Sequence, residues 1–157
     1  MRGISKTVRP QPKSPLKGLA WCVFVGYSAF MFYLLFIGFA RSSRPDQRMY
    51  NIVPFKTITG YIENYQYYNW DTWIINLFGN VAAFVPFGFL IPLLFRKARG
   101  WRTIGLLFAG LLLLVETLQV TFKVGSFDVD DIILNVLGGL LGYGMYRLWR
   151  RSGSGHI

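Results

Sequence analysis

Four long apolar runs, separated by shorter polar or basic stretches, dominate the pattern of hydrophobic and polar positions along the chain. They cover residues 18–40, 73–95, 103–122 and 132–149. The first run holds 23 residues without a charge, and as a helix it is about 34 Å long, enough to cross the hydrocarbon core of a membrane. Four such runs leave too little polar sequence to cover a soluble core. The pattern therefore predicts an all-α fold, a bundle of four transmembrane helices.

Composition and charge support this prediction. The 157 residues are 53% hydrophobic and 18% aromatic, yet the formal net charge is +10. Strong positive charge can also indicate nucleic-acid binding, but here it forms short clusters between apolar runs, which is typical of membrane proteins. We expect no nucleic-acid partner. At this length we expect one membrane domain over residues 18–151, with a basic tail at 1–17 and a disordered tail at 152–157.

The distribution of Lys and Arg predicts the orientation in the membrane. Twelve of the 17 lie in alternate segments of the chain, at 2–17, 96–102 and 147–151, and five lie in the other two connections. Because cytoplasmic loops are enriched in Lys and Arg, we expect a multi-pass protein of the cell membrane with both termini in the cytoplasm.

The first external connection, residues 41–72, is long and has its own pattern. Asn51 to Phe55 is expected to be extended or turning, because the residue before Pro54 is biased away from helix. Six aromatic side chains follow in a short stretch: Tyr61, Tyr65, Tyr67, Tyr68, Trp70 and Trp73. Such residues gather at the headgroup level, so we expect an interfacial segment. Stacking on the sugar rings of an envelope glycolipid is the functional alternative.

Polar residues interrupt the last three apolar runs at corresponding depths. They are Asn76 and Asn80 in the second run, Glu116 and Gln119 in the third, and Asp128, Asp131 and Asn135 at the start of the fourth. Each set shares one face of its helix, and the topology places all of them in one layer roughly 10 Å below the outer surface. A polar side chain that faces lipid costs several kcal/mol, so these residues are expected to face each other or a water-filled cavity.

Small residues on the last run support close helix contact at this layer. Gly138, Gly139 and Gly142 lie on the same side as Asn135, an arrangement that lets membrane helices approach one another. Such contact would bring Glu116, Asp131 and the asparagines within mutual reach.

Several roles remain open for this polar layer. It can be a hydrogen-bonded lock between helices, a pocket open to the outer leaflet for a polar headgroup or glycan, or a catalytic or cation site built from carboxylates. The single histidine, His156, lies in the tail, which excludes a Ser–His nucleophile and the usual zinc sites. Proton conduction is disfavoured, because the inner halves of the helices offer almost no polar partners. We expect no cofactor and no metal.

The sequence resembles the VanZ-like family in several ordered motifs. These are Asn51-Ile-Val-Pro-Phe55, Asn76-Leu-Phe-Gly-Asn80, Phe84-Val-Pro-Phe-Gly88, Glu116-Thr-Leu-Gln119 and Phe127-Asp-Val-Asp-Asp131, followed by Asn135 and Gly138-Gly139. The resemblance covers about 51–146. It implies a link to lowered susceptibility to glycopeptide antibiotics, particularly teicoplanin, in Gram-positive bacteria. Lys123 lies just before Phe127, in a segment where members often carry an arginine, and lysine lacks the planar fork of that side chain.

The resemblance and the polar layer together favour a non-enzymatic envelope protein with an outward-facing polar pocket. Its expected partners are membrane lipids and either a lipid-linked cell-wall precursor or a lipoglycopeptide. A membrane-embedded hydrolase or transferase, with Glu116 and Asp131 as acid and base, and a structural scaffold are the alternatives. The candidate ligand-binding residues are Asn51, Pro54, Phe55, Asn76, Asn80, Glu116, Gln119, Lys123, Asp128, Asp131 and Asn135.

Overall fold

The computed structural model describes residues 15–38, 50–67, 69 and 74–152. Its long helices are α1 (Pro15–Phe36), α4 (Asn80–Leu94), α5 (Trp101–Thr121) and α6 (Val129–Arg151), and its short elements are β1 (Tyr50–Asn51), α2 (Lys56–Glu63), η2 (Ile75–Gly79), η3 (Arg96–Ala98) and β2 (Phe127–Asp128). Of the tails predicted at 1–17 and 152–157, residues 1–14 and 153–157 lie outside the described residues, whereas residues 15–17 already belong to α1. Arg41, Arg44 and Arg48 and the aromatic residues Tyr68, Trp70 and Trp73 also lie outside the described residues.

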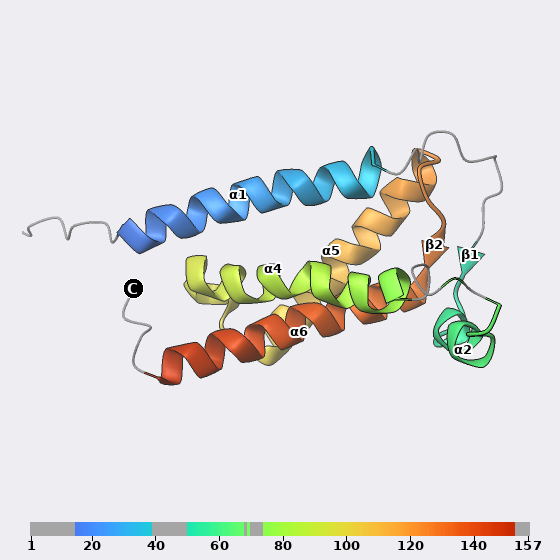
Figure 1. Ribbon diagram of the computed structural model, residues 1–157. Helices are drawn as coiled ribbons and strands as arrows, with labels where there is room; N and C mark the ends of the chain where they lie inside the picture. Colours follow the sequence, from blue (N-terminus) through green and yellow to red (C-terminus); the bar gives the residue numbers. More distant parts are fainter. Residues whose placement is uncertain (1–14, 39–49, 68, 70–73, 153–157) are drawn as a thin grey trace, which may run out of the picture.

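The four long helices form a bundle in which direction alternates along the chain. Helices α1 and α5 run one way, and α4 and α6 run the other (Figure 1). One end of the bundle carries β1, α2 and β2, and we call it the polar end. At the opposite end lie Pro15, Ser152 and η3, and we call it the basic end. The predicted all-α bundle of four helices is confirmed.

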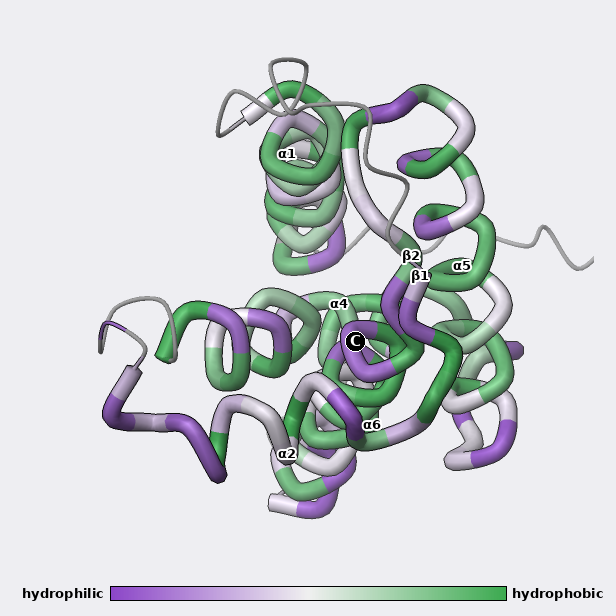
Figure 2. Tube along the Cα trace, turned by 90° about the vertical axis from the view of Figure 1, so that its right-hand side faces the viewer, coloured by the Kyte–Doolittle hydropathy of each residue, from purple (hydrophilic) through white to green (hydrophobic). Residues whose placement is uncertain are grey.

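Three helical spans within the described residues are long and apolar enough to cross a membrane: Leu16–Phe36, Ile75–Leu94 and Trp101–Thr121. Figure 2, which looks onto the polar end, shows hydrophobic residues along α1, α4 and α5, and hydrophilic ones in the segment after α2. Helix α6 has 23 residues, but acidic residues occupy its first turn and arginines its last. It packs against both α4 and α5, and these two helices cover much of its surface.

The closest helix contact joins α4 and α6. A Cβ atom added at Gly88 would collide with the Gly139 carbonyl, and one added at Gly138 or Gly142 would collide with the carbonyl of Val81 or Val85. Backbones this close require glycine, as in small-residue contacts of other membrane helices. The predicted role of these glycines in close contact is therefore confirmed.

Helix α1 is attached more loosely, through a few specific contacts. The Tyr27 hydroxyl donates a hydrogen bond to the Ala83 carbonyl at 2.9 Å, and the rings of Phe24 and Phe87 pack edge to face. The core lies instead where α4, α5 and α6 meet, around Ile104 and Phe108.

Two local features differ from the sequence-based expectation. The second membrane run begins with a π-helical turn, η2, before α4 continues through Pro86 and Pro92. The fourth helix starts earlier than expected, at Val129, because the Asp128 carboxylate caps it by accepting a hydrogen bond from the Asp130 amide at 2.9 Å. A side-chain oxygen at this position satisfies an amide that the helix leaves without a partner.

Candidate functional site

One buried carboxylate attaches the connection between α1 and α4 to the bundle. Asp130, in the first turn of α6, is fully buried. Its oxygens accept hydrogen bonds from the backbone amides of Phe55 at 2.5 Å, Thr57 at 2.7 Å and Ile58 at 3.1 Å. These amides lie at the start of α2, where a helix leaves its N–H groups without partners and favours negative charge. Asp130 therefore fixes the position and direction of α2.

Asp128 makes a second attachment beside the first. It accepts hydrogen bonds from Asn51 Nδ2 at 3.0 Å and from the Thr57 hydroxyl at 2.6 Å. In the backbone, β1 pairs in parallel with β2, so that Asn51 lies opposite Asp128 and Tyr50 opposite Phe127. These contacts leave the Asp128 carboxylate surrounded by donors of the protein itself, as expected of a hydrogen-bonded lock.

Beneath this lock, α4, α5 and α6 each bring a polar side chain. Asn80 Nδ2 donates to Asp131 Oδ1 at 2.6 Å, and the buried Glu116 accepts from the Asp128 amide at 3.3 Å. Asn135 lies one turn further along α6 and is buried. We call these four residues (Asn80, Glu116, Asp131 and Asn135) the polar layer.

The Asn135 side chain has an incomplete set of hydrogen bonds. None of the described residues donates a hydrogen bond to its buried Oδ1 atom. A buried acceptor without a donor costs about 1–3 kcal/mol, and such exceptions call for a water molecule or a ligand group. Asn135 thus marks the point where the polar layer can accept a further donor.

Gln119 points elsewhere than the sequence suggested. It shares the buried face of α5 with Glu116, but its Nε2 atom donates to the Leu35 carbonyl of α1 at 2.8 Å. It therefore connects α5 with α1. Leu35 also lines an apolar groove of about 230 Å³ between α1, α4 and α5.

The remaining candidates lie at the rim of the polar end. Pro54 and Phe55 form an exposed turn, in agreement with the expected turning segment, and Phe55 has a left-handed backbone with φ of 67°. Asn76 lies in η2 and is half-buried.

Lys123 ends α5 in a helix-stop motif. The Lys123 amide donates to the Val120 carbonyl at 3.1 Å, and the Val124 amide donates to the Gln119 carbonyl at 2.9 Å. This is the bond pattern of a Schellman motif, whose left-handed position usually holds glycine; Lys123 has φ of 58°. The side chain is exposed on the turn that leads into β2.

Comparison with known proteins assigns the family. The family model for VanZ/LLP1 matches residues 24–150. The chain belongs to the VanZ/LLP1 family. It is 36% identical to Protein VanZ of Enterococcus faecium in an alignment of 107 residues that covers 65% of this chain and 55% of that protein. The chain thus spans about half the length of this curated relative. No solved structure matches.

For this VanZ-family chain, the structure adds two residues that the sequence-based selection of site residues omitted. Asp130 and Thr57 carry most of the hydrogen bonds that hold α2. The available signal was the position of Asp130 at the start of a helix, where a carboxylate is favourable. Its contacts with amides more than 70 residues earlier in the chain leave no mark in the local pattern.

The carboxylates of this VanZ-family member face different partners. Within residues 15–38, 50–67, 69 and 74–152, no group of three or more His, Cys, Asp or Glu side chains is arranged to hold a metal ion. Asp128 and Asp130 turn toward the connection that contains α2, whereas Asp131 turns toward α4. Asp128 and Asp130 thus attach the connection that contains α2, whereas Asp131 belongs to the polar layer.

Proposed function

We propose that this VanZ-family protein binds an amphiphilic molecule at its polar end and thereby lowers susceptibility to glycopeptide antibiotics. The ligand would be a lipid-linked cell-wall component or a lipoglycopeptide such as teicoplanin. One observation carries the proposal, namely that the apolar groove and the polar side chain of Gln119 meet at Leu35. This residue lines the groove, and its carbonyl binds Gln119, one turn from Glu116. An acyl chain and a polar head can therefore occupy neighbouring places.

The chemistry of the groove suits a hydrocarbon chain. Except for Ser28, its lining is apolar, with aromatic rings from α1, α4 and α5 such as Phe32, Phe84 and Phe108. The Ser28 hydroxyl is already bound to the Phe24 carbonyl at 2.7 Å. The loose attachment of α1 gives this groove an opening toward the surrounding lipid.

The chemistry of the polar layer suits a hydrogen-bond donor on the ligand. The unpartnered Oδ1 atom of Asn135 and the carboxylate of Glu116 are acceptors that hydroxyl, amide or ammonium groups recognise. Asp128 and Asp130 accept hydrogen bonds from the connection that contains α2, whereas Glu116 and Asp131 accept from the Asp128 amide and from Asn80 Nδ2. We therefore assign Asp128 and Asp130 to holding the connection that contains α2, and we place the proposed ligand contact at Asn135, beside Glu116 and Asp131 of the polar layer.

The proposed orientation puts this site outside the cell. Lys and Arg residues occupy the basic end, at Lys17, in 96–102 and in 147–151, and positive charge favours the cytoplasmic side. Both termini would then be cytoplasmic, and the polar layer would face the compartment in which cell-wall precursors and glycopeptides meet.

Removing the charge of Glu116 tests the polar part of this proposal. We expect Glu116→Gln to lower ligand affinity about tenfold, since a hydrogen bond to a charged group contributes roughly 1.5–3 kcal/mol. Teicoplanin susceptibility of a sensitive Gram-positive host is measured at matched protein levels. Glu63→Gln, an exposed acid on α2, is the control and should match the wild type. Full resistance from Glu116→Gln would favour the lock instead, because an amide can replace a carboxylate there.

Filling the groove tests the apolar part separately. Leu111 lines the groove, whereas Leu113 is similarly exposed on α5 but lies outside it. We expect Leu111→Trp to abolish the resistance phenotype by occupying the space of an acyl chain, and Leu113→Trp to leave it unchanged. Equal phenotypes of the two variants would contradict binding in the groove. Binding of an acylated glycopeptide and of its deacylated form to both purified variants gives the direct measurement.

A further inference from the structure

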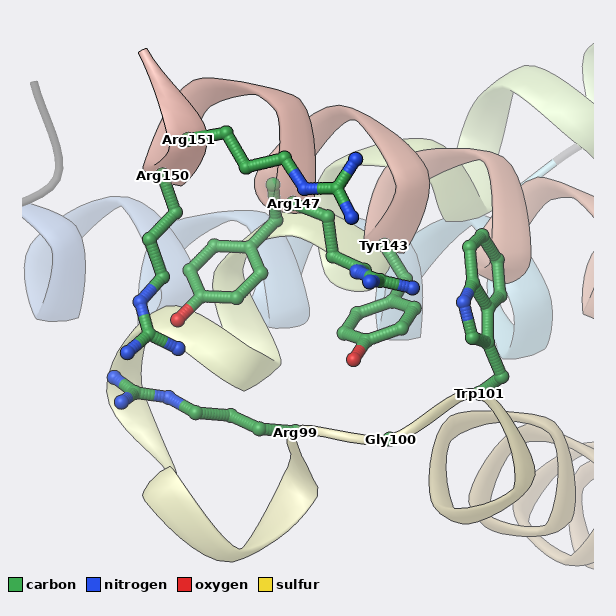
Figure 3. A pocket seen from close by; sticks show the side chains of 8 residues that line it. Arg99, Gly100, Trp101, Tyr143, Arg147, Arg150 and Arg151 are labelled. Carbon is green, nitrogen blue, oxygen red and sulfur yellow. The ribbon is translucent and has the colours of Figure 1, made fainter. Parts of the chain in front are cut away.

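A second pocket lies at the basic end, opposite the proposed ligand site. It has a volume of about 520 Å³ and is lined by four arginines, Arg99, Arg147, Arg150 and Arg151, together with Trp101 and Tyr143. Arg99 comes from the turn between η3 and α5, and the other three arginines come from the last two turns of α6. Figure 3 shows Arg99 and Arg150 extending toward each other from opposite walls, with the Tyr143 hydroxyl pointing into the space between the walls. We call it the arginine pocket.

Two of these arginines are held in place. Arg99 Nε donates to the Pro92 carbonyl at 3.0 Å, and its guanidinium lies 5.9 Å from the ring centre of Tyr146. The guanidinium of Arg147 lies 5.8 Å from the ring centre of Trp101. In contacts of this kind the face of the aromatic ring attracts the positively charged guanidinium group. Arg99 and Arg147 are therefore preorganised, which lowers the entropy lost on binding.

The positive charge of the pocket has no acidic counterpart at this end of the described structure. The described acidic residues are Glu63, Glu116, Asp128, Asp130 and Asp131, and all of them belong to α2 or to the polar-end parts of α5, β2 and α6. The guanidinium groups of Arg99 and Arg150 approach each other (Figure 3) and repel, and an anion placed between them, with Arg147 and Arg151 lining the same pocket, removes this repulsion. Guanidinium groups match the oxygens of phosphate especially well, because their planar fork makes two parallel hydrogen bonds.

We propose that the arginine pocket binds the phosphate group of an anionic phospholipid. Its position favours a lipid over a soluble phosphate. It lies at the end of membrane-spanning helices, beside a Trp101 ring that is 46% exposed, and Leu148 on the same part of α6 is 67% exposed. The phosphate would lie among the arginines while the acyl chains follow the apolar surface of α5 and α6. Basic pockets between helices on the cytoplasmic side are known to bind such headgroups.

The test compares two pairs of arginines at the same end of the protein. Arg147→Gln/Arg150→Gln removes two charges from the pocket, and Arg96→Gln/Arg102→Gln removes two exposed charges outside it. The full-length protein is released from nanodiscs of phosphatidylcholine with phosphatidylglycerol, and the retained phosphatidylglycerol is measured by native mass spectrometry. We expect about tenfold or greater loss of retained lipid for the pocket variant and less than about twofold for the control.

Further measurements distinguish phospholipid binding in the pocket from general attraction to a basic surface and from binding of a soluble anion. Equal losses for both variants would overturn the proposal, because they would indicate general attraction of anionic lipid to a basic surface. Calorimetric titration of the detergent-purified protein with inorganic phosphate gives the second arm. Binding of inorganic phosphate as tight as that of a short-chain phosphatidylglycerol would assign the pocket to a soluble anion and overturn the lipid assignment. A third variant, Arg150→Gln/Arg151→Gln, changes only exposed side chains in the last turn of α6. We expect this variant to retain less lipid at an unchanged melting temperature, which would separate a loss of binding from a loss of folding.

Discussion

Asp130→Ala is expected to detach the connection containing α2 from the bundle and to lower the free energy of unfolding by about 3 kcal/mol or more. The carboxylate is 0% exposed and accepts three backbone amide hydrogen bonds from the start of α2. Alanine would leave these donors without an acceptor and would remove the negative charge from the N-terminus of the helix. It would also remove the support that holds Phe55 in its left-handed conformation, a conformation that costs about 1–3 kcal/mol by itself.

The effect of Asp130→Ala can be measured at two levels. Denaturant unfolding in detergent gives the loss of stability, and limited proteolysis between residues 50 and 67 reports detachment of the segment. Glu63→Ala is the matched control, because Glu63 is an exposed acid on the same short helix. Unchanged proteolysis of Asp130→Ala would show that β1–β2 pairing and the Asp128 contacts suffice to hold the connection. Asp130→Asn is expected to lie between wild type and alanine, since the amide keeps one acceptor oxygen.

Gly142→Ala is expected to disrupt the contact between α4 and α6, with a loss of about 3 kcal/mol or more. The added methyl group would collide with the Val85 carbonyl and with the backbone of Gly88. Backbone atoms of two packed helices cannot move aside as a flexible side chain can, so the helices must separate along their length. The polar layer depends on this contact, because Asn80 of α4 meets Asp131 of α6 about three turns away.

Gly110→Ala provides the control for this substitution. Gly110 also lies within a membrane helix, α5, but a Cβ atom there meets nothing within 4 Å. We expect Gly110→Ala to be neutral or stabilising by up to about 1 kcal/mol, since alanine is the better helix former. Denaturant unfolding of both variants in the same detergent makes the comparison. A similar stability of Gly142→Ala and Gly110→Ala would show that α4 and α6 can separate at little cost.

The candidate site was only partly predictable from the chain. Regular spacing predicted that Glu116, Asp131 and the asparagines lie near one end of the bundle, because helix geometry converts sequence distance directly into depth. The same regularity did not indicate the partner of Gln119, which shares a face with Glu116 but binds the Leu35 carbonyl. A side chain near the boundary of a buried face can turn to either neighbour, and spacing does not decide which helix lies there.

The sequence by itself determined the membrane-spanning character, the four helices, the asymmetry of positive charge and the presence of polar residues near one end. All of these follow from local properties: the length of apolar runs, helix periodicity and charge counted along the chain. The tertiary structure decided which donors each carboxylate meets, and it left the Asn135 Oδ1 atom without a donor among the described residues. Asp128 and Asp130 find their donors more than 70 residues away, partly in backbone amides that every residue type except proline possesses, and so no residue pattern identifies them. The tertiary structure also brought Arg99 to the arginines of α6, since only packing makes one pocket from residues of two distant segments.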